Sequence, residues 1–518
     1  MSRIRMSKLD RCLYISSSLR SSRSTECRFL KLRISDRSAS RTRTTLALPV
    51  GTVIGAVDSN VEYFRGIPYA SPPTGTKRLR PPVRETNIGI AFGATGIGPS
   101  CPQMTNVDLN PFIEEVGSIP VVAAALSILE DAPDVTEDCL TISVMRPINT
   151  SPDAKLPVLF WIYGGGFEVG SPVPYNGSHL IPASIAQGTP IVLVTVNYRL
   201  GGFGFLPGEQ VLADGVSNLG LLDQRMGLEW VADNIAAFGG DPERVTIWGQ
   251  SAGAFSVFDQ MALYGGNIGY HGKPSFRAGI MNSGTIWPVE PIDAPRAQNI
   301  FDTVAETAGC GSVADDEKLD CLRGLSFEEF YNATNSVFSP FSDHSPVSSF
   351  AARPDGRVMP DSPDALARDG RFAPVSIIVG DQEDEGTFLS LTQTNLTTHS
   401  DLLTFLSAIA YQNATLSQLE PLVSLYPYAN GTGGSPYGSG AVPSNNSYPQ
   451  FKRLAAILGD TVFIMMRRAF LSVLPPAPKM KAWSYLATYG KGTPIIGTFH
   501  TMDLQMLFYG TDDASKAM

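Results

Sequence analysis

The stretch from Gly249 to Gly253 constrains this chain more than any other. It reads Gly-Gln-Ser-Ala-Gly and lies between an apolar segment at 245–248 and a segment of helical character that begins at Ala252. Glycines two residues on either side of a serine permit a turn too tight for Cβ atoms. Such a strand–turn–helix is typical of a nucleophile elbow, which exposes the hydroxyl group of Ser251 and leaves helix N–H groups free for an oxyanion.

These five letters alone do not establish a reactive serine, because glycine and serine are common in turns. An ordinary Gly/Ser turn and a nucleophile elbow both fit them. The rest of the chain has to distinguish the two.

Strand-like and helix-like segments alternate along most of the chain. Residues 51–75 predict an antiparallel hairpin or meander, and the later strands are apolar throughout, as expected for a buried parallel sheet. The pattern predicts the α/β class with a mostly parallel, doubly wound sheet. The predicted strands are 156–171, 189–199, 277–284, 373–381 and 481–489, and the predicted helices are 218–242 and 451–474.

Composition favours one large globular domain. The chain has 518 residues, of which 43% are hydrophobic, and neither a repeat nor a linker divides it. We expect no transmembrane segment, because no run of about 18 apolar residues occurs. The net charge is −10 although the first 46 residues are basic, so the remainder is strongly acidic. An acidic body argues against nucleic acid as a partner.

Residues 1–46 are rich in serine and arginine and lack the apolar core of a signal peptide. Their composition resembles a transit peptide, but a disordered tail or a wrongly assigned first exon in place of a signal peptide explains it equally well. We favour the last two and place the folded domain at 47–518.

Cysteines and glycosylation sequons favour an oxidising, secretory route. Four cysteines form two local pairs, Cys101 with Cys139 and Cys310 with Cys321, and no cluster of Cys and His indicates a metal site. We expect no metal and no cofactor. Sequons occur at Asn149, Asn176, Asn332, Asn395, Asn413, Asn430 and Asn445.

The segment 119–132, between Cys101 and Cys139, is apolar on nearly all faces. A buried core helix is the simpler interpretation. The alternative is a lid, in which a disulfide-closed loop at 101–139 covers a cleft and turns outward at a lipid interface.

Acyl transfer through a serine needs a base and an acid that orients it. Four of the five histidines lie in polar loop contexts, whereas His500 lies shortly after the last predicted strand, where α/β sheets place their sites. The order serine, acid, histidine puts the acid between 251 and 500. Four carboxylates lie at or just after the end of the predicted strand 373–381, and the residues alone do not indicate which of them is the acid. They are Asp381, Glu383, Asp384 and Glu385.

Three glycines end another buried strand, immediately before Phe167. Glycine lets backbone N–H groups approach a substrate oxygen without side-chain obstruction, so this turn is a candidate for part of an oxyanion hole. A flexible turn is the simpler alternative, but a turn alone would not need three glycines after so apolar a strand.

Together these stretches resemble the type-B carboxylesterase/lipase family of α/β-hydrolases, most closely secreted fungal lipases with a lid and more distantly the cholinesterases. The resemblance covers about residues 48–518. The stretches that carry it are FRGIPYASPPTG (64–75), EDCL (137–140), WIYGGGFEVGS (161–171), VNYR (196–199), the run from NLGLLDQ to GQSAG (218–253), FRAGIMNSG (276–284), GDQEDEGTF (380–388) and GTFH (497–500).

The resemblance implies an α/β-hydrolase fold and assigns roles. It implies that Ser251 is the nucleophile, that Glu385 is the acid, and that His500 is the base. It further implies two disulfides, Cys101–Cys139 and Cys310–Cys321. The implied oxyanion donors are Gly165, Gly166 and Ala252.

The chain departs from the family's pattern in three places. Gln250 stands where close relatives often have glutamate, and Thr501 stands where serine is common. Relatives also continue further beyond the histidine, so we expect a chain shortened at its C-terminus.

These observations predict a secreted serine hydrolase of carboxylic esters. Phe167, Phe255 and Phe388 are expected to bind an apolar substrate, such as a lipid, and the lid to contact a lipid interface transiently. Whether the chain is a lipase or an esterase for soluble esters stays open, as does the alternative of a non-catalytic or truncated inactive member that acts as a binding protein.

Overall fold

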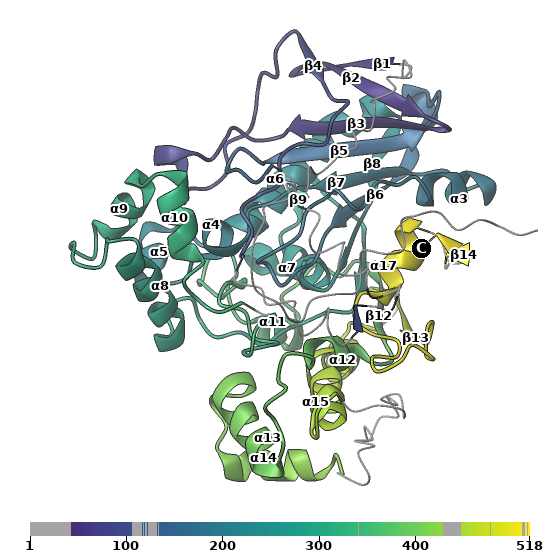
Figure 1. Cartoon of the computed structure of the whole chain (residues 1–518). Coiled ribbons are helices and arrows are strands. Elements are labelled where there is room, and N and C mark those ends of the chain that lie inside the picture. Colours follow the sequence, from purple (N-terminus) through teal and green to yellow (C-terminus); the bar gives the residue numbers. More distant parts are fainter. Residues whose placement is uncertain are drawn as a thin grey trace, which may run out of the picture. The chain divides into compact units, whose positions relative to one another are not determined.

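The computed structural model is described here for residues 43–105, 116–117, 119, 122, 132, 134–339, 341–427, 447–476, 478–509, 513–514 and 516–517. An 11-stranded sheet with the order β1-β2-β3-β5-β7-β6-β8-β11-β12-β13 organises this part of the chain, and β4 pairs with β2 (Figure 1). Its strands are β1 (Arg43–Leu48), β2 (Gly51–Asp58), β3 (Val61–Pro68), β4 (Ala91–Gly93), β5 (Thr141–Pro147), β6 (Leu156–Ile162), β7 (Val192–Val196), β8 (Gly240–Gln250), β11 (Ala278–Asn282), β12 (Ser376–Gln382) and β13 (Ala482–Ala487).

The strand directions confirm both predicted parts of the sheet. Strands β1, β2, β3 and β5 pair antiparallel, and β5 pairs antiparallel with β7. From β7 to β13 every pairing along the order is parallel. The carboxyl ends of the parallel strands therefore meet at one edge, where the turns that follow β6, β8, β12 and β13 come together.

The folded part begins earlier than the composition predicted. Strand β1 pairs with β2 from Arg43 onward, so residues 43–46 belong to the sheet and not to the basic extension. This strand reads Arg-Thr-Thr-Leu-Ala-Leu, and an edge strand needs only one buried face, to which Leu48 contributes a buried side chain. Residues 1–42 lie outside the described part.

Helices cover both faces of the parallel strands (Figure 1). The helices used below are α6 (Leu219–Asn234), α7 (Ala252–Gly266), α11 (Pro363–Arg368), α12 (Glu385–Leu389), α15 (Phe451–Leu458), α16 (Met465–Ser472) and α17 (Met502–Tyr509). On one face α6 packs Gly227 against Phe160, and α7 packs Val257 against Gly279. On the other face Phe508 of α17 contacts Trp161 and Trp248.

The predicted helix 451–474 is divided into three. Helices α15 and α16 flank a π-helical segment, Gly459–Ile464. Here α12 approaches so closely that a Cβ atom on Gly386 would lie 2.0 Å from the carbonyl oxygen of Ala455. This contact holds the start of α12 against α15 and so fixes Glu385, which precedes Gly386.

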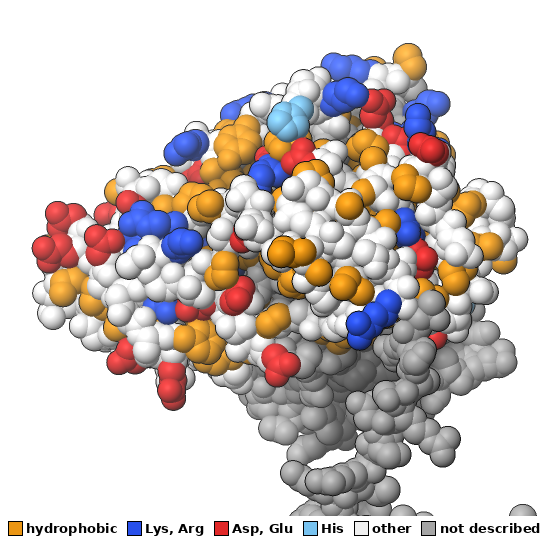
Figure 2. Space-filling view, turned by 90° about the horizontal axis from the view of Figure 1, so that it is seen from above, with side chains coloured by type: hydrophobic (Ala, Val, Ile, Leu, Met, Phe, Trp, Pro, Cys, Tyr) orange, Lys and Arg blue, Asp and Glu red, His pale blue; other side chains and the backbone are white. Residues whose placement is uncertain are grey.

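Several of the motifs form buried ion pairs. Arg199 of VNYR lies 2.6 Å from Asp223 of α6, and Arg78 lies 2.6 Å from Glu137 of EDCL. Both disulfides are present, Cys101–Cys139 and Cys310–Cys321. On the face seen in Figure 2, charged side chains of both signs are interspersed with apolar ones.

The candidate lid falls largely outside the described residues. Of the segment 119–132, the structure describes residues 119, 122 and 132, and Val122 is fully buried. Both interpretations, core helix and lid, stay predictions. Within the described ranges, no helix combines the length and apolar character needed to cross a membrane.

The Arg199–Asp223 pair gives a test of the fold. Asp223 accepts hydrogen bonds from the Nε, Nη2 and backbone N–H of Arg199, and both side chains are almost fully buried. We expect Asp223→Asn to lower the free energy of unfolding by about 3–5 kcal/mol, because it leaves a buried guanidinium without its counter-charge.

The measurement is chemical denaturation with circular dichroism. Asp369→Asn is the matched control, because it breaks the exposed Arg368–Asp369 pair. Equal stability of the two variants would contradict a structural role for the buried pair.

Candidate active site

The turn between β8 and α7 has the geometry of a nucleophile elbow. Ser251 adopts φ 56° and ψ −126°, a conformation that costs free energy for a residue with a Cβ atom. A Cβ atom on Gly249 would lie 2.2 Å from the carbonyl oxygen of Gly253, and one on Gly253 would lie 2.0 Å from that of Ile162. Both positions therefore need glycine, and the ordinary-turn interpretation of this stretch does not account for such close contacts.

His500 and Glu385 lie together at the same edge of the sheet. His500 follows β13 in a loop, and Glu385 begins α12 immediately after β12. The Nδ1 atom of His500 lies 2.6 Å from the Oε2 atom of Glu385, and both side chains are buried. The backbone N–H of Gln382 donates to the other oxygen of Glu385. A carboxylate held in this way fixes the orientation of an imidazole ring.

The structure distinguishes the four carboxylates that the sequence left as alternatives. Asp381 pairs with Arg467 at 2.5 Å and Glu383 pairs with Lys491 at 2.8 Å. Asp384 accepts a hydrogen bond from the backbone N–H of Thr498. Glu385 is the one of the four that contacts His500. The other three carboxylates hold together the strands and loops around it.

Gln250 contacts the other nitrogen of the histidine ring. Its Nε2 atom lies 3.3 Å from His500 Nε2. Among the described residues, the structure records no hydrogen bond between the Ser251 hydroxyl group and this ring. Such bonds are often long until substrate binds. An amide brings no charge to the ring.

Two of the three predicted oxyanion donors face a cavity beside the serine. Gly166 and Ala252 line it together with Ser251 and His500, whereas Gly165 does not. Gly165 and Gly166 adopt φ values of 110° and 65°, which glycine tolerates. Ala252 is the first residue of α7, so its N–H group has no carbonyl partner within the helix.

The cavity has a volume of about 730 Å³ and a mostly apolar wall. Phe167 and Phe255 line it, as predicted for substrate-binding residues, and Trp287 packs edge-on against Phe255. Phe388 does not line it. This ring is fully buried and lies behind the wall against Phe499 and Phe341, since α12 turns its side chain into the core.

A second layer of buried polar groups, which the sequence did not indicate, lies under the histidine. The side-chain amide of Asn282 donates a hydrogen bond to Asp503 at 2.6 Å, and its oxygen accepts one from the indole N–H of Trp248. Burial, with a contribution from the negative charge of Glu385, raises the pKa of Asp503 to about 6. Burial likewise raises the pKa of Asp381 to about 7. Asp381 was among the candidate acids of the sequence, whereas Asp503 belongs to no motif, so no local signal could have revealed it.

No group of three or more His, Cys, Asp or Glu side chains in the described part of the chain is arranged to hold a metal ion. What the site combines is an exposed hydroxyl group, a buried imidazole with a carboxylate partner, and free N–H groups beside an apolar cavity. These are the parts that acyl transfer to a serine requires.

Comparisons with known proteins agree with this geometry. The model of the carboxylesterase family matches residues 42–512. The chain is 51% identical to the secreted triacylglycerol lipase LIP1 of Gibberella zeae over 484 residues, which are 92% of this chain and 80% of the lipase. It is 49% identical to secreted lipase 1 of Botryotinia fuckeliana, covering 92% of this chain and 82% of that one.

The crystal structure of EstA from Aspergillus niger superposes with a TM-score of 0.72 at 30% identity, covering 90% of this chain and 82% of EstA. The fold is therefore that of the α/β-hydrolase carboxylesterases, as the resemblance implied.

Asp503 gives a pH-dependent prediction. Its pKa of about 6 in the folded protein lies above the value near 4 of an unfolded chain, so between these values the folded state keeps a proton that the unfolded state releases. The contribution of this group to the free energy of unfolding is therefore greatest below pH 4. It falls as the pH rises to 6, by about 3 kcal/mol at most. We expect Asp503→Asn to flatten this part of the profile.

The measurement is the free energy of unfolding of both proteins at pH 4.5, 5.5 and 6.5. Asp369→Asn, which changes an exposed carboxylate, serves as the control for surface charge. An unchanged slope in Asp503→Asn would contradict the assignment.

Proposed function

From the premise that this chain belongs to the carboxylesterase family and hydrolyses carboxylic esters, we propose that hydrolysis proceeds through an acyl-enzyme on Ser251. The single observation that supports this most is the elbow, which holds Ser251 in a strained conformation at the wall of the cavity that His500 also lines. The family match to residues 42–512 contains all of these positions.

In the first half-reaction the hydroxyl group of Ser251 attacks the ester carbonyl, and His500 Nε2 accepts its proton. The N–H groups of Gly166 and Ala252 stabilise the oxyanion, with Gly165 as the third expected donor. The protonated ring then gives its proton to the leaving alcohol. In the second half-reaction His500 activates a water molecule in the same way, and the acid product leaves.

Glu385 keeps the histidine in the productive tautomer. Its carboxylate accepts a hydrogen bond from Nδ1–H, which leaves Nε2 free as the base, and it stabilises the imidazolium that forms. Gln250 reaches Nε2 without a charge, so in this proposal the carboxylate of Glu385 provides the main electrostatic stabilisation of the charged ring.

The substrate we propose is an ester with an apolar acyl chain, and the protein is a secreted lipase. The mostly apolar cavity of about 730 Å³ supports this, as do the names of the relatives from Gibberella zeae and Botryotinia fuckeliana. Two disulfides support an extracellular location, because disulfides persist in oxidising compartments. The loop closed by Cys101–Cys139 would act as the lid at a lipid surface.

Ser251→Ala tests the nucleophile. We expect kcat for p-nitrophenyl butyrate to fall about 10⁶-fold, to a residual rate supported by the oxyanion donors and by binding. The melting temperature of the variant should match or exceed that of the parent. Within the described residues the structure records no hydrogen bond of the Ser251 hydroxyl group, so alanine removes none. Parental activity in a folded Ser251→Ala protein would refute the assignment.

The lid has its own test. We expect the rate of tributyrin hydrolysis to rise sharply where the substrate concentration passes its solubility limit, because a surface would turn the apolar face of 119–132 outward. p-Nitrophenyl acetate, which forms no interface over the same range, is the control substrate. A smooth saturation curve for both substrates would remove the lid and leave an esterase for soluble esters.

A further inference from the structure

Asp259 is a buried carboxyl group in the wall of the substrate cavity. It lies on α7, is 3% exposed, and lines the cavity that Ser251 and Phe255 also line. The structure records no hydrogen bond or ion pair for it within the described residues. Burial alone raises the pKa of this carboxyl group well above its usual range, so no neighbouring cation compensates for its position.

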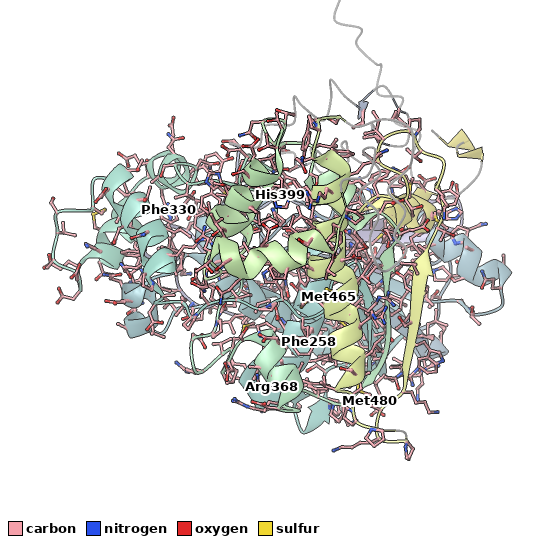
Figure 3. The ribbon with its side chains drawn as sticks, turned by 90° about the horizontal axis from the view of Figure 1, so that it is seen from below. Phe258, Phe330, Arg368, His399, Met465 and Met480 are labelled. Carbon is pink, nitrogen blue, oxygen red and sulfur yellow. A yellow bond between two sulfur atoms is a disulfide. The ribbon has the colours of Figure 1, made fainter. Side chains whose placement is uncertain are left out.

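The two arginines in the cavity wall have partners other than Asp259, and Arg296 lies over the ring of Phe338. Arg353 pairs with Glu290 at 3.0 Å. Figure 3 labels Phe258, the neighbouring residue on α7. Its ring packs against Phe470 of α16 and against Phe372. Asp259 itself is buried and lines a mostly apolar cavity, and a buried carboxyl group is costly unless something hydrogen-bonds to it.

Its place along the helix relates it to the serine. Phe255 and Asp259 are four residues apart and share one face of α7, Ser251 is the residue immediately before this helix, and all three line the cavity. Eight residues of helix correspond to about 12 Å. An extended alkyl chain with bonds of about 1.5 Å advances about 1.3 Å per carbon, so a chain that follows α7 from the serine reaches Asp259 near its tenth carbon.

We propose that Asp259 is a specificity-determining residue, which hydrogen-bonds to an oxygen substituent in the middle of a long acyl chain. A carboxyl group accepts hydrogen bonds and, when it carries its proton, also donates one, so it suits a hydroxyl group and, with its proton, a keto or epoxide oxygen. An unsubstituted acyl chain would cover the carboxyl group of Asp259 without offering it a hydrogen-bond partner, and this would lower kcat/KM for the unsubstituted ester. The preferred substrates are thus esters of mid-chain oxygenated fatty acids. This inference rests on the proposed function.

The test compares p-nitrophenyl esters of octadecanoic acid that carry a hydroxyl group at carbon 10, at carbon 3, or nowhere. We expect kcat/KM for the 10-hydroxy ester to exceed that for the plain ester by about tenfold, the size of one good hydrogen bond. The 3-hydroxy ester should show no such gain. Asp259→Leu, of similar size and apolar, should reverse the preference, and Asp259→Asn, which still donates and accepts, should keep it.

Each failure has a distinct meaning. Wild-type hydrolysis of p-nitrophenyl butyrate, which is too short to reach Asp259, reports on the proposed function alone. If the wild type hydrolyses butyrate but treats the 10-hydroxy and plain esters equally, or if Asp259→Leu keeps the preference, the inference about Asp259 is wrong.

Thermal unfolding separates a binding role from a structural one. Asp259→Leu should melt at the parental temperature or above it, because it removes an unpaired buried polar group. A variant that fails to fold or melts well below the parent would show that the carboxyl group has a structural partner, and that would also overturn the inference.

Discussion

The close contact between the start of α7 and strand β6 is the constraint on which the site depends. Gly253 lies so near the carbonyl oxygen of Ile162 that no larger residue fits, and Gly249 lies equally near Gly253. The two glycines let the chain reverse directly from strand to helix. The strain falls on Ser251 between them, and the packed sheet on both sides maintains it. A looser turn would let the serine relax away from the cavity.

The histidine and its carboxylate depend on a second close contact, that of Gly386 with α15. Helix α12 carries Glu385 at its first residue, and the π-helical segment after α15 lets Gly459 approach the same point. Parallel strands bring β8, β12 and β13 to one edge, and these contacts set the side chains within hydrogen-bonding reach. The other three carboxylates near Glu385 bind the surrounding strands and loops together through partners of their own, and Glu385 is the one that contacts His500.

Much of this arrangement could be predicted from the sequence, because the motifs carry backbone constraints. The elbow, the alternating strands and the order of serine, acid and histidine follow from local patterns. The choice of Glu385 among four neighbouring carboxylates did not follow from the residues, since all four are equally polar and differ in what the fold places beside them. Phe388 was expected to bind substrate, and the structure places its buried ring behind the cavity wall, because the helical turn directs it inward. Asp503 and Asp259 belong to no motif and became visible through burial.

We propose that the chemistry occurs at the hydroxyl group of Ser251. The most direct measurement is mass spectrometry of the intact, folded protein after brief reaction with a fluorophosphonate, followed by peptide mapping. We expect one covalent adduct per chain, on the peptide that contains Ser251, and no adduct when the protein is unfolded before the reaction. An adduct on a different residue, or none on the folded protein, would contradict it.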